Sequence, residues 1–538
     1  MKEKFMRWDT LLFQYFKRDW KKILIWVLGI GIFSAGYVPA FIEITKDNKA
    51  LIGMYQTLQN PAMTSIIGPT PIDTATDYTL GAMYSHTMLL FCGLFSMIMS
   101  ALHIVGHTRK EEDLGILELV RSFHIGRQAN SLAALKEISI INILITIFIG
   151  GLMYSFNAET ISLEGAFLFG ASIGMAGILG GALALVMSQI MSSSSSATGS
   201  TLGIIGLLYI IRAATDVSNI KLSMINPLSW TYLTYPFTED NWLPLLFAFI
   251  LSIVLVVLAF ALEGNRDMGA GYLPEREGRA HAKQSLLSIP GLFIRINRGV
   301  IIAWLVGYLV LSVTYGSIYG DMETFLNSSE IVQQMFNFAG FSIEESFTST
   351  IMMVMMGLVC ILPIIIVNKL YNVESRLYIS QLHATKVTRG QFYWVNIGLA
   401  VLSGLLGIFA VAIGLGGTAI SVMSDSSRME ILDFFAAGLN FLPAILFFIG
   451  LAALALGWLP GLGKTVYVYL TYSFVLNYFS GILDLPNWFI KTAIKSWIPR
   501  MPMENFDGTI FFTITAISIG MIVMGYIGYK NRDMVEGS

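Results

Sequence analysis

Residues 242–262 read WLPLLFAFILSIVLVVLAFAL, a run of 21 residues without Asp, Glu, Lys or Arg. A helix needs about 20 apolar residues to cross a hydrocarbon core of about 30 Å, and it pairs its own backbone groups there. Twelve such runs occur, at 23–42, 83–105, 138–155, 165–191, 197–211, 242–262, 299–320, 347–367, 391–419, 434–457, 465–483 and 509–529. The sequence therefore predicts an all-α polytopic membrane protein with twelve transmembrane helices.

The composition of the whole chain agrees with this class. Of its 538 residues, 55% are hydrophobic and 13% are charged, whereas soluble globular chains carry about 25% charged residues. The net charge of −2 gives no indication of a nucleic-acid partner. Both cysteines, Cys92 and Cys360, fall inside spans, so we expect packing roles for them and no disulfide.

The basic residues predict the orientation of the chain. Twelve crossings return both termini to one side, and the segments on that side hold 25 of the 33 Lys and Arg residues. Because cytoplasmic segments carry the excess of Lys and Arg, both termini are predicted to be cytoplasmic. The long basic N-terminal region, followed by a long apolar run, favours an uncleaved first span over a signal peptide.

Short matches at a nearly constant offset indicate an internal duplication. Charged residues that follow equivalent spans recur 262 to 266 residues later; the pairs are Glu112 and Glu374, Arg127 and Arg389, and Arg266 and Arg532. We therefore predict two six-span repeats in parallel orientation, at 1–262 and 299–538, joined by a cytoplasmic linker at 263–298. A pseudo-twofold axis along the membrane normal relates such repeats in many transporters.

The segment that follows the second span has the pattern of a short surface helix. It begins with Glu111, Glu112 and Asp113, as a helix N-terminus prefers, and apolar residues recur every three positions from Leu114 to Val120. This spacing favours an amphipathic helix at the cytoplasmic face. A solvated loop helix without a partner is the alternative that the spacing leaves open.

Two segments resemble a known family. Glu112-x-x-Gly115-x-x-Glu118-Leu119-Val120, followed by Arg127, resembles the motif of ABC-2 type transport permeases. Residues 266–274, followed by Arg276, resemble the linker of the fused twelve-span permeases of the polyketide-antibiotic and multidrug exporter type. The resemblance implies a coupling helix at about 109–128 and a matching coupling segment at about 371–390.

The resemblance also implies roles for individual residues. Those implied in ATPase coupling are Glu112, Gly115, Glu118, Arg127, Glu374 and Arg389, and those implied in the linker are Arg266, Asp267, Gly271 and Arg276. The chain departs from the family in having His124-Ile125 where a proline is usual. Its second copy has also lost the glycine and the second glutamate, which questions whether both halves engage the ATPase equally.

The function implied by the resemblance is that of a permease subunit of an ATP-binding cassette exporter in the bacterial plasma membrane. ATP and Mg²⁺ are then held by a separate ATPase subunit, in two copies, and the cargo is a hydrophobic or amphipathic small molecule such as an antibiotic. We expect no catalytic residue and no cofactor in this chain. The nearest approach to a phosphate-binding P-loop, at 457–465, has its first glycine out of place and follows no strand.

The substrate path is expected along the second, fifth, eighth and eleventh spans, as the resemblance implies. Met and Tyr adapt to varied apolar ligands, and the candidates for lining the path are Phe95, Met97, Met352, Met356, Tyr467 and Tyr472. Packing between helices is the alternative for each of them. Gly170, Gly174, Gly177 and Gly181 in the fourth span indicate close helix packing.

Two other functions remain possible from the sequence alone, an ion-coupled secondary transporter and a membrane-embedded lipid-modifying enzyme. Ion coupling requires ionisable residues within spans, and the predicted spans hold none apart from Arg212 at the edge of the fifth and His86 and His103 near the ends of the second. His103, His107 and Glu111 share one helical face, a spacing that a metal ion could use. Because no fourth ligand is visible, we expect no metal site.

Overall fold

The computed structural model describes residues 2–44, 48–59, 61–273, 281–321, 342–375, 382, 387–423, 429–479 and 486–533. All regular secondary structure within these ranges is helical. Eleven helical segments there are long and apolar enough to cross a membrane. The predicted class, an all-α polytopic membrane protein, is therefore confirmed.

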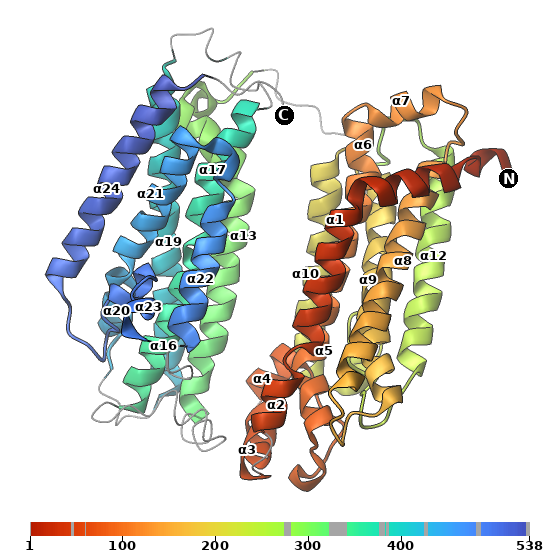
Figure 1. Cartoon of the computed structure of the whole chain (residues 1–538), viewed down its shortest axis with the longest axis horizontal. Helices are drawn as coiled ribbons and strands as arrows, with labels where there is room; N and C mark the ends of the chain where they lie inside the picture. The colour runs from red at the N-terminus through yellow and green to blue at the C-terminus, as the bar shows by residue number, and fades with distance from the viewer. Residues whose placement is uncertain are drawn as a thin grey trace. The chain divides into compact units, whose positions relative to one another are not determined.

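The chain divides into two compact units, residues 1–278 and 279–538, and Figure 1 shows each as a bundle of long helices. The division falls inside the segment 263–298. The main helices of the first unit are α1 (Trp8–Ala35), α2 (Val38–Ile44), α3 (Asn48–Leu58), α4 (Pro61–Ile67), α5 (Leu80–His107), α6 (Arg109–Asp113), α7 (Ile116–Ser122), α8 (Ala129–Ser155), α9 (Leu163–Ile190), α10 (Ser194–Ser218), α11 (Ile220–Ser223) and α12 (Leu243–Asn265).

The second unit repeats the long helices but breaks two of them. Its helices are α13 (Ile289–Ser317), α16 (Ile343–Val359), α17 (Ile361–Ser375), α19 (Arg389–Val422), α20 (Ile431–Asn440), α21 (Leu442–Trp458), α22 (Thr465–Phe479), α23 (Asn487–Ile490) and α24 (Gly508–Asn531). A proline follows each break, Pro363 near the start of α17 and Pro443 in the first turn of α21. Proline lacks the N–H that a continuous helix needs but fits the first turn of a new one.

The helix α9 forms the centre of the first unit through its glycines. A Cβ added at Gly170 would lie 2.6 Å from the Thr146 carbonyl oxygen of α8, and one at Gly174 would lie 2.8 Å from the Asn142 carbonyl oxygen. A side chain larger than hydrogen at these positions would separate the two helices. The predicted close packing is confirmed at Gly170, Gly174 and Gly177, whereas a Cβ at Gly181 would meet only ordinary contacts from 3.4 Å outward.

The expectation about ionisable residues in the spans is wrong. The helix α8 begins at Ala129, before its apolar window, and it contains Glu137, which is fully buried. The helix α10 continues to Ser218, past Arg212, which is also fully buried. Arg212 forms a 2.8 Å ion pair with Asp216 one turn later, so its charge is compensated inside the bundle. The physical reason is that partners within the fold let these helices extend beyond the apolar residues.

The eleventh predicted span, at 465–483, corresponds to α22. This helix has 15 described residues, which at 1.5 Å per residue rise about 22 Å, less than a hydrocarbon core. Residues 480–483 lie outside the described ranges. The count of twelve spans and the parallel repeat therefore stay predictions.

Candidate functional site

The segment expected to couple to an ATPase forms two short helices at one end of the first unit. Figure 1 shows α7 running across the ends of the long helices, at the same end as the N-terminus. Gly115 separates α6 from α7 and has a φ of +71°, a left-handed conformation that costs glycine little. Since a Cβ there would meet nothing within 4 Å, the turn requires this glycine for its backbone and not for space.

Glu112 is the centre of a polar cluster at this end, and its side chain is 5% exposed. Its two oxygens accept hydrogen bonds from Arg266 at 2.8 and 2.9 Å, from the Gly269 backbone N–H at 2.6 Å and from Arg109 at 3.2 Å. Arg266 follows α12, 154 residues away along the chain. The carboxylate therefore joins the start of the coupling segment to the end of the last helix of the unit.

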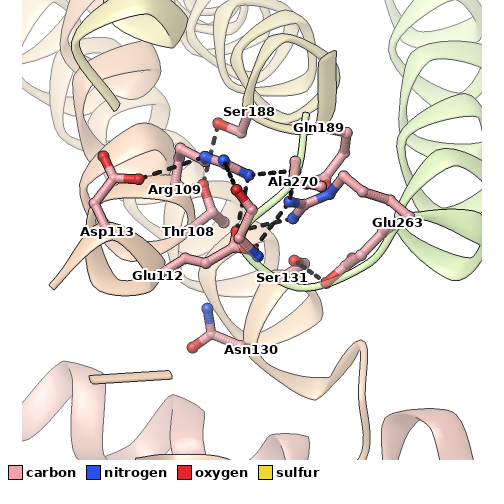
Figure 2. Close-up of polar contacts among 12 residues, drawn as sticks. Thr108, Arg109, Glu112, Asp113, Asn130, Ser131, Ser188, Gln189, Glu263 and Ala270 are labelled. Carbon is pink, nitrogen blue, oxygen red and sulfur yellow. Dashed lines mark hydrogen bonds and ion pairs between the residues drawn. The ribbon is translucent and has the colours of Figure 1, made fainter. Parts of the chain in front are cut away.

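Arg109 contacts Glu112 in the same cluster (Figure 2). This side chain is 1% exposed and donates to the carbonyl oxygens of Gly269 at 2.8 Å and Ala270 at 2.9 Å. Asp113 lies 3.5 Å from the Arg109 Nε and accepts from the Ser194 backbone N–H at 2.6 Å. We call Arg109, Glu112, Arg127 and Arg266 the Glu112 cluster; Arg109 was missed from the sequence because its partners are backbone carbonyls.

Linker residues pack against the connection between α9 and α10. The Arg266 Nε donates to Gln189 at 3.2 Å. A Cβ on Gly271 would lie 2.6 Å from the Ser192 backbone nitrogen, so the two chains approach as closely as glycine allows. Asp267 is exposed, and Arg276 lies outside the described residues.

The second unit contains a matching set, Glu374, Arg389 and Arg532, which we call the Glu374 cluster. Glu374 is buried and accepts from Arg532 at 2.5 Å, while the Arg389 guanidinium lies 3.6 Å from its other oxygen. Arg389 donates to the Arg532 carbonyl oxygen at 2.7 Å, as Arg127 does to the Arg266 carbonyl oxygen in the first unit. Two contacts thus recur in both units: an ion pair between the glutamate and the later arginine, and a hydrogen bond from the other arginine to that arginine's carbonyl oxygen.

The two clusters differ in how completely the carboxylate is satisfied. Glu112 accepts four hydrogen bonds, whereas Glu374 Oε1 accepts none within the part of the chain that the structure describes. The position equivalent to Arg109, at the offset of 262 residues, is Tyr371, which carries no positive charge. Half of the coupling segment expected at 371–390, namely 376–381 and 383–386, lies outside the described residues.

The helix α7 carries an exposed apolar surface. Leu117 is 5% exposed and packs on the unit, whereas Leu114, Leu119 and Phe123 are 61%, 65% and 63% exposed. Of the apolar residues that recur every three positions, Leu117 is buried, Val120 is half-buried and Leu114 is exposed. Glu118 is exposed between these apolar side chains. Burial lowers the pKa of the Arg121 guanidinium, which still keeps its positive charge at neutral pH.

The expected path residues differ in their surroundings. Met97, Met352 and Met356 are fully buried, and a Cβ on Gly180 would lie 2.5 Å from the Met97 Cγ, so Met97 packs on α9. Phe95 is 47% exposed. The Tyr472 hydroxyl lies 2.6 Å from the Thr492 Oγ1. Their roles in transport stay predictions.

Tyr467 lines a cavity of about 950 Å³ in the second unit. The walls are mainly apolar, with two lysines and two asparagines; the lining residues are Leu292, Phe293, Ile296, Val300, Ile365, Asn368, Lys369, Asn372, Val373, Leu382, Phe392, Lys464 and Tyr467. Ligand pockets for drug-sized molecules measure roughly 300–1,000 Å³ and combine apolar walls with a few polar groups. The Lys369 ammonium donates to the Ile296 carbonyl oxygen at 2.8 Å.

Comparisons with known proteins bear on the resemblance. Residues 286–530 match the family model described as "Multidrug efflux system permease Rv1217c, C-terminal domain". Over 531 residues the chain is 25% identical to the multidrug efflux system permease protein Rv1217c of Mycobacterium tuberculosis, and the alignment covers 97% of this chain and 94% of that relative. These matches agree with the predicted recognition: residues 286–530 are similar to an efflux-permease domain, and the chain is similar to a bacterial multidrug efflux permease along nearly its whole length.

Proposed function

We propose that the chain is the transmembrane permease subunit of an ATP-driven exporter and that a separate ATPase subunit docks on α7. The observation that carries this proposal is the exposed apolar surface of α7 at Leu114, Leu119 and Phe123. Contiguous exposed apolar side chains on a soluble face of a protein typically belong to an interaction site. The names of the relatives support an efflux permease, and the ATPase is our addition.

The Glu112 cluster gives α7 a rigid base for such a partner. A force applied to α7 passes through Gly115 and α6 to Glu112, and from there to Arg266 at the end of α12. Both side chains are nearly buried, so their ion pair is screened little by salt. Closure of two ATPase copies around ATP would thereby move the ends of α5 and α12 together.

The cargo that we propose is a hydrophobic or amphipathic compound. The cavity beside Tyr467 supports this class, since its walls are apolar and its volume suits a drug-sized molecule. Lys369, Lys464, Asn368 and Asn372 supply polar groups at the same cavity. Widening the aromatic wall with Phe293→Ala and Phe392→Ala should therefore change the preference between cargo sizes.

The docking proposal is tested with the full-length chain and the ATPase that co-purifies with it. The double variant Leu119→Ser/Phe123→Ser should bind that ATPase at least about tenfold more weakly, since 1.4 kcal/mol is less than the burial of one such side chain contributes. The matched control is Leu287→Ser, because Leu287 lies outside α7 and its apolar side chain is 77% exposed. Equal binding by the double variant and the control would refute docking on α7.

A second measurement separates this function from an ion-coupled transporter, which the buried Glu137–His103 pair favours. Inverted membrane vesicles should accumulate ethidium when ATP is added, and a protonophore should leave that accumulation unchanged. Proteoliposomes that hold only this chain and accumulate ethidium on a proton gradient would overturn the proposal.

A further inference from the structure

A second polar cluster lies at the same end of the first unit, between α1, α5 and α8. The His103 Nε2 lies 2.9 Å from the Glu137 Oε2, and the His107 Nε2 lies 3.9 Å from that same oxygen. The Asp19 Oδ2 lies 2.9 Å from the His107 Nε2. Two imidazoles of α5 and the Glu137 carboxylate of α8 thus offer ligand atoms that all lie within 4.8 Å of one another, and Asp19 of α1 lies beside His107.

We propose that His103, His107 and Glu137 bind one divalent transition-metal ion of the Zn²⁺ class, with water as the fourth ligand. Ligand atoms at about 2.0–2.1 Å from a tetrahedral Zn²⁺ lie about 3.3 Å from one another. The separations of 2.9 and 3.9 Å from the Glu137 Oε2 to the two histidine nitrogens bracket that value, and all three ligand atoms lie within 4.8 Å of one another. Imidazole with carboxylate is a ligand set that Zn²⁺ and its neighbours accept.

Unsatisfied groups within the cluster point to a bound cation. Among the described residues, the Glu137 Oε1 and the His103 Nδ1 have no hydrogen-bond partner, although both side chains are 0% exposed. A buried carboxylate with a single hydrogen bond is costly unless a positive charge compensates it. A divalent ion bound by Glu137 supplies that charge.

The surrounding charges leave room for this ion. Three carboxylates lie in or beside the cluster, those of Asp19, Glu111 and Glu137. Arg18 is paired with Glu111 at 2.9 Å, and the Lys22 ammonium lies 4.3 Å over the Trp26 ring. Two positive groups face three negative ones, so the cluster carries an excess negative charge when both imidazoles are neutral, as they must be to bind a metal ion.

Outer contacts would hold the histidines in place. Glu111 Oε1 lies 3.5 Å from the His107 Nδ1, so this nitrogen can donate to a carboxylate once a metal ion replaces the proton on Nε2. Carboxylates behind a metal-bound imidazole orient the ring in this way. Arg18, which lies 2.5 Å from the same Nδ1 without the ion, keeps its pair with Glu111.

The fold supplies what the sequence did not show. His103, His107 and Glu111 lie on α5 and α6, whereas Glu137 comes from α8, at a position with no local relation to them. An ion at this centre would join α8 to the helix that leads into the Glu112 cluster. The proposal does not depend on which ATPase or cargo the protein has.

The test measures metal content in the purified full-length chain, with its affinity tag removed and free metal dialysed away. After incubation with ZnCl₂, elemental analysis should find about one zinc per chain. The variants His103→Asn and Glu137→Gln should each hold less than about a tenth of that. The matched control is His124→Asn, an exposed histidine on the same segment of chain, which should keep full zinc content.

A second measurement does not depend on buried variants that fold. Co²⁺ added to the wild-type chain should give the visible absorption of a four-coordinate site, and ZnCl₂ should remove that absorption. Six-coordinate Co²⁺ absorption, or zinc content equal in wild type and in a folded Glu137→Gln variant, would overturn the proposal.

Discussion

The Glu112 cluster should contribute more to stability than the Glu374 cluster, although the two are built from equivalent residues. Glu112→Gln keeps the shape of the side chain but places an amide NH₂ opposite the donors Arg266 and Arg109. About two charge-assisted hydrogen bonds are lost, each contributing about 1.5–3 kcal/mol. Removing one partner of a buried pair costs about 3–5 kcal/mol, and with relaxation of the exposed linker we expect about 3 kcal/mol.

Glu374→Gln should cost less, about 1–1.5 kcal/mol, because within the described residues a single hydrogen bond reaches that carboxylate and the amide oxygen can still accept it. The assay is unfolding of each purified variant by sodium dodecyl sulfate in mixed micelles, followed by tryptophan fluorescence. A double-mutant cycle with Arg266→Gln should give a coupling energy of about 2 kcal/mol for Glu112.

Two results would refute this reasoning. One is a Glu374→Gln variant that loses as much stability as Glu112→Gln. The other is a coupling energy below about 0.5 kcal/mol between Glu112 and Arg266, which is the size expected for an exposed pair. Reversing the charge of each glutamate extends the comparison from stability to transport. ATP-dependent transport should fall further in Glu112→Arg than in Glu374→Arg. Equal losses would show that both coupling segments serve the ATPase alike.

Three further variants test the fold around the site by the same unfolding assay. Gly271→Ala should destabilise by about 1–3 kcal/mol, because its Cβ would lie 2.6 Å from a backbone nitrogen, whereas Gly203→Ala, which has open space, should be neutral or stabilising. Gly115→Ala should cost about 1–2 kcal/mol through its positive φ. Arg212→Leu should cost about 3–5 kcal/mol by leaving Asp216 without its charge partner, and adding Asp216→Leu should recover most of that loss.

The sequence predicted what depends on local composition. Apolar runs located the helices, and the glycines of α9 indicated close packing that the structure confirms at three of four positions. The sequence did not predict where a helix ends when its polar residues contact distant segments of the chain. The hydropathy window of α10 ended at residue 211, but Arg212 finds Asp216 one turn on and the carbonyl oxygen of Ile66 at 2.8 Å, so the helix continues. Nothing near Arg212 in the sequence reveals the contact with Ile66.

The sequence identified only part of the candidate site, because the contacts that build the site join residues far apart along the chain. The motif identified Glu112 but not the direction of its side chain, since its main partner, Arg266, is 154 residues away. A signal did exist in the repeats. In each half of the sequence, a glutamate follows one span and an arginine follows another, at nearly the same spacing. An ion pair within each repeat would explain why the two opposite charges occur together in both halves.

The burial of these charges changes how mutations in the coupling segment should be interpreted. Glu112 and Arg266 contact each other and not the exterior, so a transport defect on replacing either does not show that it contacts an ATPase. The side chains available to a partner are the apolar ones at Leu114, Leu119 and Phe123. Replacing them should weaken binding with little change in the free energy of unfolding, whereas replacing Glu112 should lower stability first and binding only as a consequence. Measuring both quantities for both sets therefore separates residues that bind the partner from residues that position the segment.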